Sequence, residues 1–185
     1  MILMDLEEVV RSRKSVRKFQ DRSVEAEKIS KCLDAARLAP SWKNRQCWHF
    51  IVVRDKETIA KLATNVAWSW AKSVPVMIAA CGNPELSGNT NGQMYYLVDV
   101  TIAMEHLVLE AVNLGLGTCW LGTFDERRVK ELLKIPEEIR VVALTPLGYP
   151  LQSSGDESEG RPRKNLVEIV YGDEWGNHFD RLSRE

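Results

Sequence analysis

A basic segment near the N-terminus holds the residues best suited to chemistry. Arg11–Phe19 reads RSRKSVRKF, and five of its nine residues are basic. If the chain after Lys14 is extended, Ser15 and Arg17 point to the same side, because alternate residues of an extended chain share a face. Arg13 would lie just above them on the last turn of a preceding helix. Two guanidinium groups and a hydroxyl on one side favour a phosphate, with which arginine makes paired, charge-assisted hydrogen bonds.

Two other interpretations of this segment stay open. The charges could simply be solvated at a helix end, where cations near the C-terminus are mildly favourable. A nucleic-acid patch is less favoured, because aromatic residues are not interleaved with the cations. Lys and Arg total 25 against 26 for Asp and Glu, so the whole chain has no general attraction to nucleic acid.

A second basic group near the C-terminus could complete one anion pocket with the N-terminal segment. It comprises Arg161, Arg163 and Lys164.

Other common chemistries find little support in the sequence. The four cysteines, Cys32, Cys47, Cys81 and Cys119, stand far apart, and the three histidines are scattered, so a metal site is not expected. Gly115 and Gly117 are not a dinucleotide loop, because Trp120 occupies the third glycine's place and a long helix precedes them. Gly122 is different, since a glycine there could let a backbone N–H approach a flat ligand.

The elements that must position these residues are predicted from apolar periodicity and turn signals. The 185 residues suit a single domain. Expected helices lie at about 5–13, 24–38, 55–63, 95–114 and 126–133, and expected strands at 47–53, 74–81 and 140–149. The helix at 95–114 is apolar on more than one face and is expected to be central. Residues 165–171 have strand character and could form an arm. Strands separated by helices indicate an α+β or α/β layered domain.

The N-terminus and the overall hydropathy favour a cytoplasmic protein. No apolar run approaches the roughly 20 residues of a membrane span. The sequence begins MILMDLEEVV, without the basic region that precedes a signal peptide's apolar core. Reduced, buried thiols are then the expected state of the cysteines.

Five segments, in this order, resemble the nitroreductase family of flavoproteins. They are RKSVRKF (13–19), APSWKNRQCWHFIVV (39–53), GLGTCWLGTF (115–124), LGYP (147–150) and RPRKNLVEIV (161–170). The resemblance implies a single α+β domain over 1–185, with a mainly antiparallel sheet flanked by helices and a C-terminal arm, about 165–185, exchanged in a homodimer. It also implies FMN at the subunit interface, NADH or NADPH as donor, and a nitroaromatic, quinone or similar acceptor.

The resemblance further implies roles for individual residues. Arg13, Lys14 and Ser15 match phosphate contacts, and Arg17 matches a cation at the pyrimidine edge of the flavin. The loop expected to reach the flavin from the other subunit contributes Pro40, Ser41 and Asn44. The backbone expected against the ring belongs to Leu121, Gly122 and Thr123. The C-terminal cations expected to close over the phosphate are Arg161 and Arg163.

The acceptor is the least determined part of this interpretation. The chain is short for the family, and Cys47 stands where the family usually has proline. Four aromatic residues could line a pocket for flat acceptors, although tryptophans are as readily core residues; the four are Trp68, Trp70, Tyr95 and Phe124. An FMN-binding protein that stores flavin or senses redox state, without significant turnover, is the alternative function.

Overall fold

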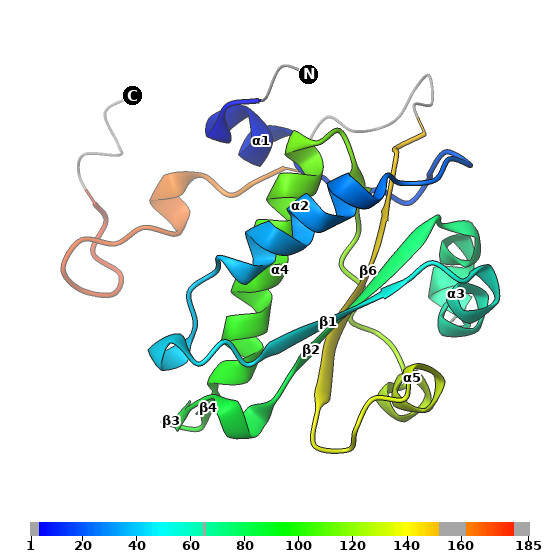
Figure 1. The fold of residues 1–185 in the computed structure, drawn as a ribbon. Helices are drawn as coiled ribbons and strands as arrows, with labels where there is room; N and C mark the ends of the chain where they lie inside the picture. The colour runs from blue at the N-terminus through cyan, green and yellow to red at the C-terminus, as the bar shows by residue number, and fades with distance from the viewer. Residues whose placement is uncertain (1–3, 65, 152–161, 180–185) are drawn as a thin grey trace. The chain divides into compact units, whose positions relative to one another are not determined.

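The structure, a computed structural model, describes residues 4–64, 66–151 and 162–179 (Figure 1). The chain divides into two compact units, Met1–Ser154 and Gly155–Glu185. The sequence-predicted helices and strands of the first unit are present, with ends that move by a few residues.

An antiparallel sheet forms the centre of the first unit. Its four strands follow the order β1 (Trp48–Val53), β2 (Val76–Gly82), β6 (Arg140–Gly148) and β5 (Gly117–Thr118). Every neighbouring pair is antiparallel. All seven residues of β2 are buried, as a central strand covered on both faces requires. The fold is therefore α+β, and the α/β alternative is wrong because no parallel pair joins these four strands.

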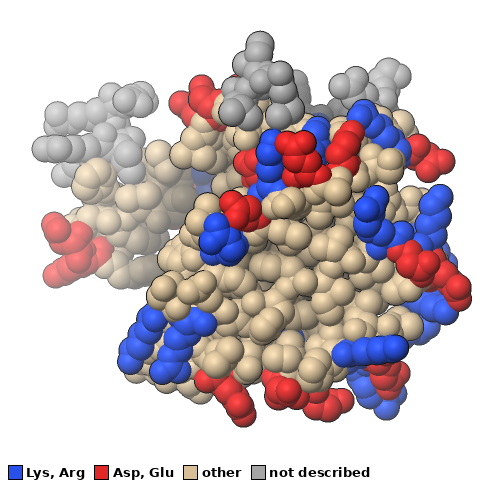
Figure 2. Space-filling model, in the orientation of Figure 1, with Lys and Arg blue, Asp and Glu red and all other residues tan. Residues whose placement is uncertain are grey.

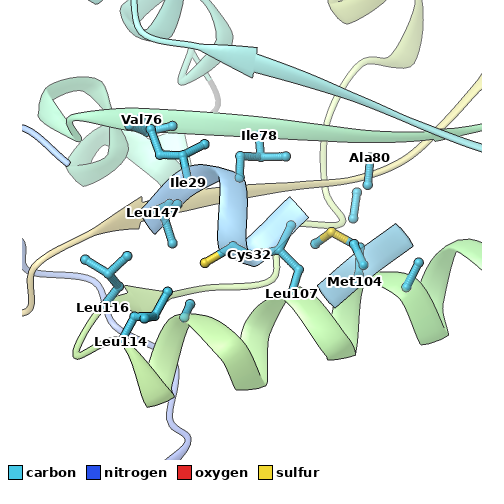
Figure 3. Packing of buried hydrophobic residues seen from close by; sticks show 14 of the residues in the cluster. Ile29, Cys32, Val76, Ile78, Ala80, Met104, Leu107, Leu114, Leu116 and Leu147 are labelled. Carbon is cyan, nitrogen blue, oxygen red and sulfur yellow. The ribbon is translucent and has the colours of Figure 1, made fainter. Parts of the chain in front are cut away.

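Helices cover both faces of this sheet. On one face, Val76, Ile78 and Ala80 of β2 pack against α2 (Ala26–Arg37) and α4 (Tyr95–Asn113), as Figure 3 shows. Met77, Ala79 and Cys81 point to the other face, where α3 (Lys56–Leu62), the 3-10 segment η2 (Val66–Ser73) and α5 (Glu126–Leu133) pack. This alternation follows from the two-residue repeat of a strand. Leu107 of α4 is fully buried in the first cluster, and its truncation to alanine would cost about 2–5 kcal/mol.

Aspartates begin the shorter helices. Asp5 accepts a hydrogen bond from the Glu8 N–H at 2.8 Å and so caps α1 (Leu6–Ser12). Asp55 accepts the Thr58 N–H at 2.8 Å at the start of α3. Each side chain satisfies one of the backbone donors that a helix leaves unpaired at its N-terminus. The helices expected to begin near residues 5 and 55 are confirmed.

Two segments differ from the sequence-based expectation. Between the expected strand at 74–81 and the expected helix at 95–114, the chain forms η3 (Pro84–Leu86) and a short hairpin of β3 (Asn89–Thr90) and β4 (Gln93–Met94). The strand character expected at 165–171 is wrong, because these residues contain the 3-10 turn η4 (Leu166–Glu168). Asn165 and Glu168 form a reciprocal capping box there, and these local hydrogen bonds compete with extended structure. An isolated bridge, Tyr171 to His178, closes the following turn.

Candidate functional site

The basic segment leaves α1 in an extended conformation and lies along β5. The Val16 N–H donates to the Thr118 carbonyl at 2.8 Å, and Ser15 forms a parallel bridge with Thr118. Val16 is buried, whereas Ser15 and Arg17 are exposed. Ser15 and Arg17 therefore share the outer face, as the two-residue repeat predicted.

Three motifs that lie far apart in the sequence meet along this segment. A Cβ atom at Gly117 would lie 2.6 Å from Val16 Cγ2, so only glycine lets the segment cross β5 this closely. Further along, the Gln20 N–H donates to the Tyr149 carbonyl at 2.9 Å, and Phe19 bridges Pro150. The glycine motif of 115–118 and the motif of 147–150 thus hold the basic segment in place.

Most cations after the helix end have no acidic partner among the described residues. Arg13, Lys14 and Arg17 form no ion pair there, and the Arg17 guanidinium only approaches the Ser15 carbonyl, at 3.5 Å. Arg11, on the helix just before, instead pairs with Glu7 at 2.8 Å. Unpaired cations beside a serine hydroxyl fit a phosphate group, which would supply the missing negative charge.

The segment after β5 is held against β6 and is partly exposed. Leu121 is buried and exchanges hydrogen bonds with Leu144 of β6 at 2.9 and 3.0 Å, while Gly122 and Thr123 are exposed. Gly122 has ordinary space around it, since an added Cβ would come no closer than 3.5 Å to the Trp120 ring. Trp120, which the sequence did not single out as a site residue, is 43% exposed.

The loop after α2 has an unusual backbone. Lys43, Asn44 and Gln46 all have positive φ angles, of 48°, 56° and 51°, a region that non-glycine residues seldom adopt. Ser41 stabilises the loop, because its hydroxyl oxygen accepts the Gln46 N–H and its carbonyl accepts the Asn44 N–H, both at 2.9 Å. Pro40 and Asn44 are exposed and Ser41 is half-buried.

The basic segment and this loop lie near opposite ends of α4. The Trp42 N–H donates to Asp99 in the second turn of that helix, whereas Thr118 follows the helix's C-terminal end. From Asp99 to Asn113 the helix rises about 20 Å, at about 1.5 Å per residue. Figure 1 shows the same separation within one chain.

The four aromatic residues expected to line a substrate pocket do not come together in one chain. Trp68 is buried and lies 6.2 Å from Phe124, ring centre to ring centre, on the η2 and α5 side of the sheet. Trp70 stacks with Phe19 at 6.4 Å. Tyr95 starts α4 on the other side and contacts Trp42 at 4.4 Å. Trp68 is a core residue in the single chain.

A small cavity of about 160 Å³ lies between α3 and α5, with Phe124, Lys61 and Arg128 among its lining residues. It is smaller than the roughly 300 Å³ at which ligand pockets begin. Of the C-terminal cations, Arg163 is exposed in the second unit, and Arg161 lies outside the described residues. No helix in the described ranges is long and apolar enough to cross a membrane.

Comparison with known proteins gives one consistent answer. The family model described as "Nitroreductase family" matches residues 10–86 and 64–149. A relative from Methanothermobacter thermautotrophicus is 38% identical over 157 residues, which cover 82% of this chain and 81% of that protein. Its name provisionally gives it as an NADH dehydrogenase/NAD(P)H nitroreductase.

Solved structures similar to this chain point to the same family as the sequence comparisons. A nitroreductase family protein from Clostridium novyi is 42% identical with a TM-score of 0.77, covering 96% of this chain and 98% of that one. A structure from Clostridium difficile, called an FMN-dependent nitroreductase, is 28% identical with a TM-score of 0.77 and covers 92% of this chain and 100% of that one.

Proposed function

Because this chain belongs to the nitroreductase family, we propose that it is an FMN-dependent oxidoreductase. It passes electrons from NADH or NADPH to a flat acceptor such as a nitroaromatic or a quinone. The observation that carries the proposal is the extended segment 13–19, in which Arg13, Lys14 and Arg17 have no acidic partner among the described residues and lie beside Ser15 against β5.

The FMN phosphate binds at this segment. Arg13, Lys14 and Ser15 supply charge and a hydroxyl, and the family resemblance assigns Arg161 and Arg163 to the same phosphate. Arg17 lies at the pyrimidine edge, where a cation stabilises negative charge on the reduced ring. When bound, FMN supplies the redox chemistry by accepting a hydride and passing the electrons on. The chain's own residues bind it, orient it and set its potential.

The ring rests against backbone on one side and receives a loop from a second subunit. Leu121, Gly122 and Thr123 lie against the ring, and Gly122 adds no side chain of its own there. Pro40, Ser41 and Asn44 lie about 20 Å along α4 from the phosphate contacts, so the same chain is poorly placed to supply both. A homodimer solves this problem, because two-fold symmetry brings the loop of each chain to the site of the other.

An exposed apolar surface supports this homodimer. Leu97 and Val98 on the outer side of α4 are 43% and 42% exposed, and Met94 just before the helix is exposed as well. In the view of Figure 2, the middle of the molecule has a broad area without charged side chains. Burying such residues in a subunit interface would gain about 25 cal/mol for each Å² of apolar surface removed from water.

The acceptor pocket would form only in the dimer. Phe124 and the exposed Trp120 border the ring-facing segment 121–123, whereas Tyr95 would arrive from the partner subunit with the 82–94 loop. Trp68 supports the pocket from the core. The proposal includes a cytoplasmic location, which is supported by four buried cysteines that form no disulfide.

Cofactor analysis and an anaerobic titration test the function. The purified protein is expected to be yellow and to release FMN rather than FAD, because the cations converge on one terminal phosphate. NADH or NADPH should bleach the bound flavin without oxygen, and menadione or nitrofurazone should restore the colour. A protein that binds FMN but resists bleaching would be the flavin store or redox sensor instead. Release of FAD, or failure to bind FMN after reconstitution, would contradict the proposal.

A further inference from the structure

Asp99 is an acidic residue in the most buried helix of the protein. It lies in the second turn of α4 and is 2% exposed. Its neighbours along the helix are the core residues Val100, Ala103 and Met104. A buried carboxyl is costly unless its oxygens accept hydrogen bonds. The position therefore calls for specific donors.

Three donors meet this carboxyl, and all come from loops outside α4. The Trp42 N–H donates to Oδ1 at 2.8 Å. The Ser87 hydroxyl donates to Oδ2 at 2.7 Å, and the Cys47 thiol approaches the same oxygen at 3.4 Å. Burial, with Asp99 nearby, raises the pKa of Cys47 to about 12, so the thiol keeps its proton. Asp99 thus ties together both ends of the loop that carries Ser41 and Asn44.

That loop needs contacts from residues outside it to keep its backbone conformation. Its three left-handed residues, Lys43, Asn44 and Gln46, each hold a backbone conformation that persists only where the surroundings enforce it. The Trp42 ring is fixed as well, since it contacts Tyr95 and covers Gly88 so closely that a Cβ there would lie 2.3 Å from the ring. Backbone and ring of Trp42 are therefore both anchored just before the left-handed residues begin.

We propose that Asp99 is a positioning residue that holds the Ser41–Gln46 loop, through the Trp42 N–H, in the conformation that the partner subunit's flavin site requires. The inference rests on the proposed function for its consequence, and on the hydrogen bonds of the described residues for its mechanism. Asp99 need not touch the flavin, and its effect on FMN passes through the loop backbone.

Four variants separate this role from a general contribution to stability. Asp99→Leu keeps the branched shape of the side chain in a bulkier form and removes both acceptors. Asp99→Asn keeps an oxygen for the Trp42 N–H, and its amide can donate to Ser87. Ser87→Ala removes one donor and leaves the Trp42 bond intact. Met104→Ala opens a cavity in the same helix and touches no loop donor, so it is the control for lost stability.

Two quantities are measured for each variant, at a temperature well below its unfolding temperature. The first is the rate of tryptic cleavage after Lys43 and Arg45 without cofactor, mapped by mass spectrometry. The second is the Kd of FMN. Asp99→Leu is expected to raise both by about tenfold, which corresponds to a loop that holds the competent conformation about one-tenth of the time. Asp99→Asn, Ser87→Ala and Met104→Ala should stay within about threefold of wild type in both measurements.

Failure of the inference and failure of the proposed function are distinguishable. If wild-type protein does not bind FMN, the proposed function fails, and cleavage alone still decides whether Asp99 holds the loop. If wild type binds FMN but Asp99→Leu behaves like Met104→Ala, the positioning role is overturned. Equal loss in Asp99→Asn or Ser87→Ala would overturn it too, because both keep the acceptor for Trp42. Should Asp99→Leu not fold, Asp99→Ser, whose side chain is too short to reach Trp42, replaces it under the same criteria.

Discussion

Gly117 and Gly122 stand in the same short segment, yet the chain itself requires only the first. A Cβ at Gly117 would overlap Val16, whereas one at Gly122 meets nothing closer than 3.5 Å. A glycine that its own chain does not need is explained by a group outside the chain. In the proposed site that group is the flavin ring, which lies against the backbone of 121–123.

Alanine at position 122 is therefore expected to weaken FMN binding, and alanine at position 117 is expected to lower the stability of the fold. Gly122→Ala should leave the thermal unfolding midpoint of the cofactor-free protein unchanged and raise the Kd of FMN about tenfold, a loss of about 1.4 kcal/mol. Gly117→Ala should lower the free energy of unfolding by about 1–3 kcal/mol, as overpacking does. Differential scanning calorimetry and FMN titration measure the two. Normal FMN binding by Gly122→Ala would show that the ring does not approach this backbone.

Arg17 offers a second test of a single residue. Arg17→Gln is expected to lower the midpoint potential of bound flavin, because a cation that stabilises the reduced ring is removed. Each tenfold loss in relative stability of the two-electron reduced form shifts the potential by about 30 mV. Lys18→Gln removes the same charge from the next residue and should shift the potential less. An unchanged or raised potential in Arg17→Gln would mean that Arg17 faces solvent.

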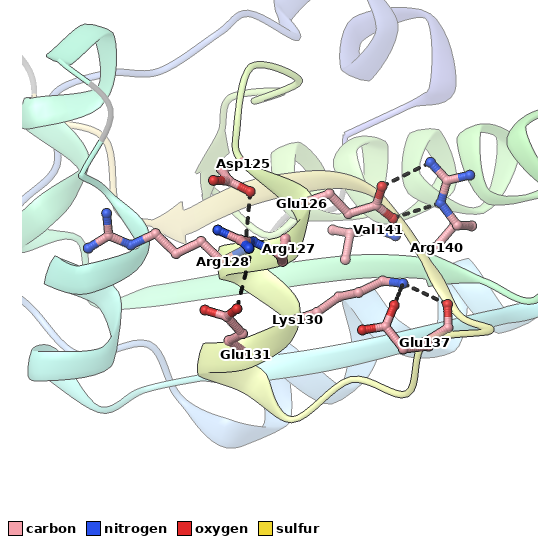
Figure 4. A network of polar contacts seen from close by, with 9 residues as sticks. All are labelled: Asp125, Glu126, Arg127, Arg128, Lys130, Glu131, Glu137, Arg140 and Val141. Carbon is pink, nitrogen blue, oxygen red and sulfur yellow. Dashed lines mark hydrogen bonds and ion pairs between the residues drawn. The ribbon is translucent and has the colours of Figure 1, made fainter.

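At the scale of elements, α5 is fastened to the sheet by a polar network (Figure 4). Glu126 accepts two hydrogen bonds from the Arg140 guanidinium, at 2.8 and 2.9 Å, and one from the Val141 N–H at 2.9 Å. Arg140 first, and the Val141 N–H after it, lower the pKa of Glu126 below its usual value. This contact holds the end of the segment that carries residues 121–124 against β6.

The Glu126 contact predicts a pH-dependent contribution to stability. A lowered folded-state pKa means that the contribution is complete above the unfolded-state pKa, about 4.3, and is lost as the pH falls through the folded-state pKa. Glu126→Gln should therefore lower the free energy of unfolding by about 1–2 kcal/mol at pH 7, with a difference from wild type that shrinks below pH 4. Urea unfolding across this range measures it.

Glu131→Gln provides the matched control on the same helix. Glu131 is well exposed and lies 3.8 Å from Arg127, so its removal should change the free energy of unfolding by less than about 0.5 kcal/mol. If the two variants lose the same amount at pH 7, or if the Glu126→Gln difference persists at low pH, the contact does not act through its charge.

At the scale of the whole molecule, the separation of the two halves of the site along α4 predicts complementation between defective chains. One variant combines Arg13→Ala with Arg163→Ala, and the other combines Ser41→Phe with Asn44→Phe. Each homodimer has a lesion in both sites and should be nearly inactive. In a mixed dimer one site collects both lesions and the other none, so refolding at equal ratio should restore about a quarter of wild-type activity.

Mass spectrometry of the intact dimers verifies that mixing occurred. Each variant mixed with wild type shows that neither chain inactivates its partner non-specifically. An absence of recovery in verified mixed dimers of folded chains would mean that each flavin site is built within one chain.

The sequence determined much of the fold because its signals are local. The caps at Asp5 and Asp55 and the apolar pattern of α4 depend on residues within a few positions of one another, and each element formed close to its expected range. The shared face of Ser15 and Arg17 followed from the repeat of an extended chain alone. The five motifs also sufficed to identify the family, which the comparisons confirmed.

Only the tertiary structure decided how distant residues combine. It brought Val16 across Gly117 and buried Trp68 beside Phe124, because burial depends on what packs against a side chain. It also gave Asp99 its three loop donors. An acid between two valines in the apolar first half of α4 was the one signal that could have marked this residue. The strand expected at 165–171 failed for a related reason, since strands need a partner and the local capping box of Asn165 and Glu168 formed instead.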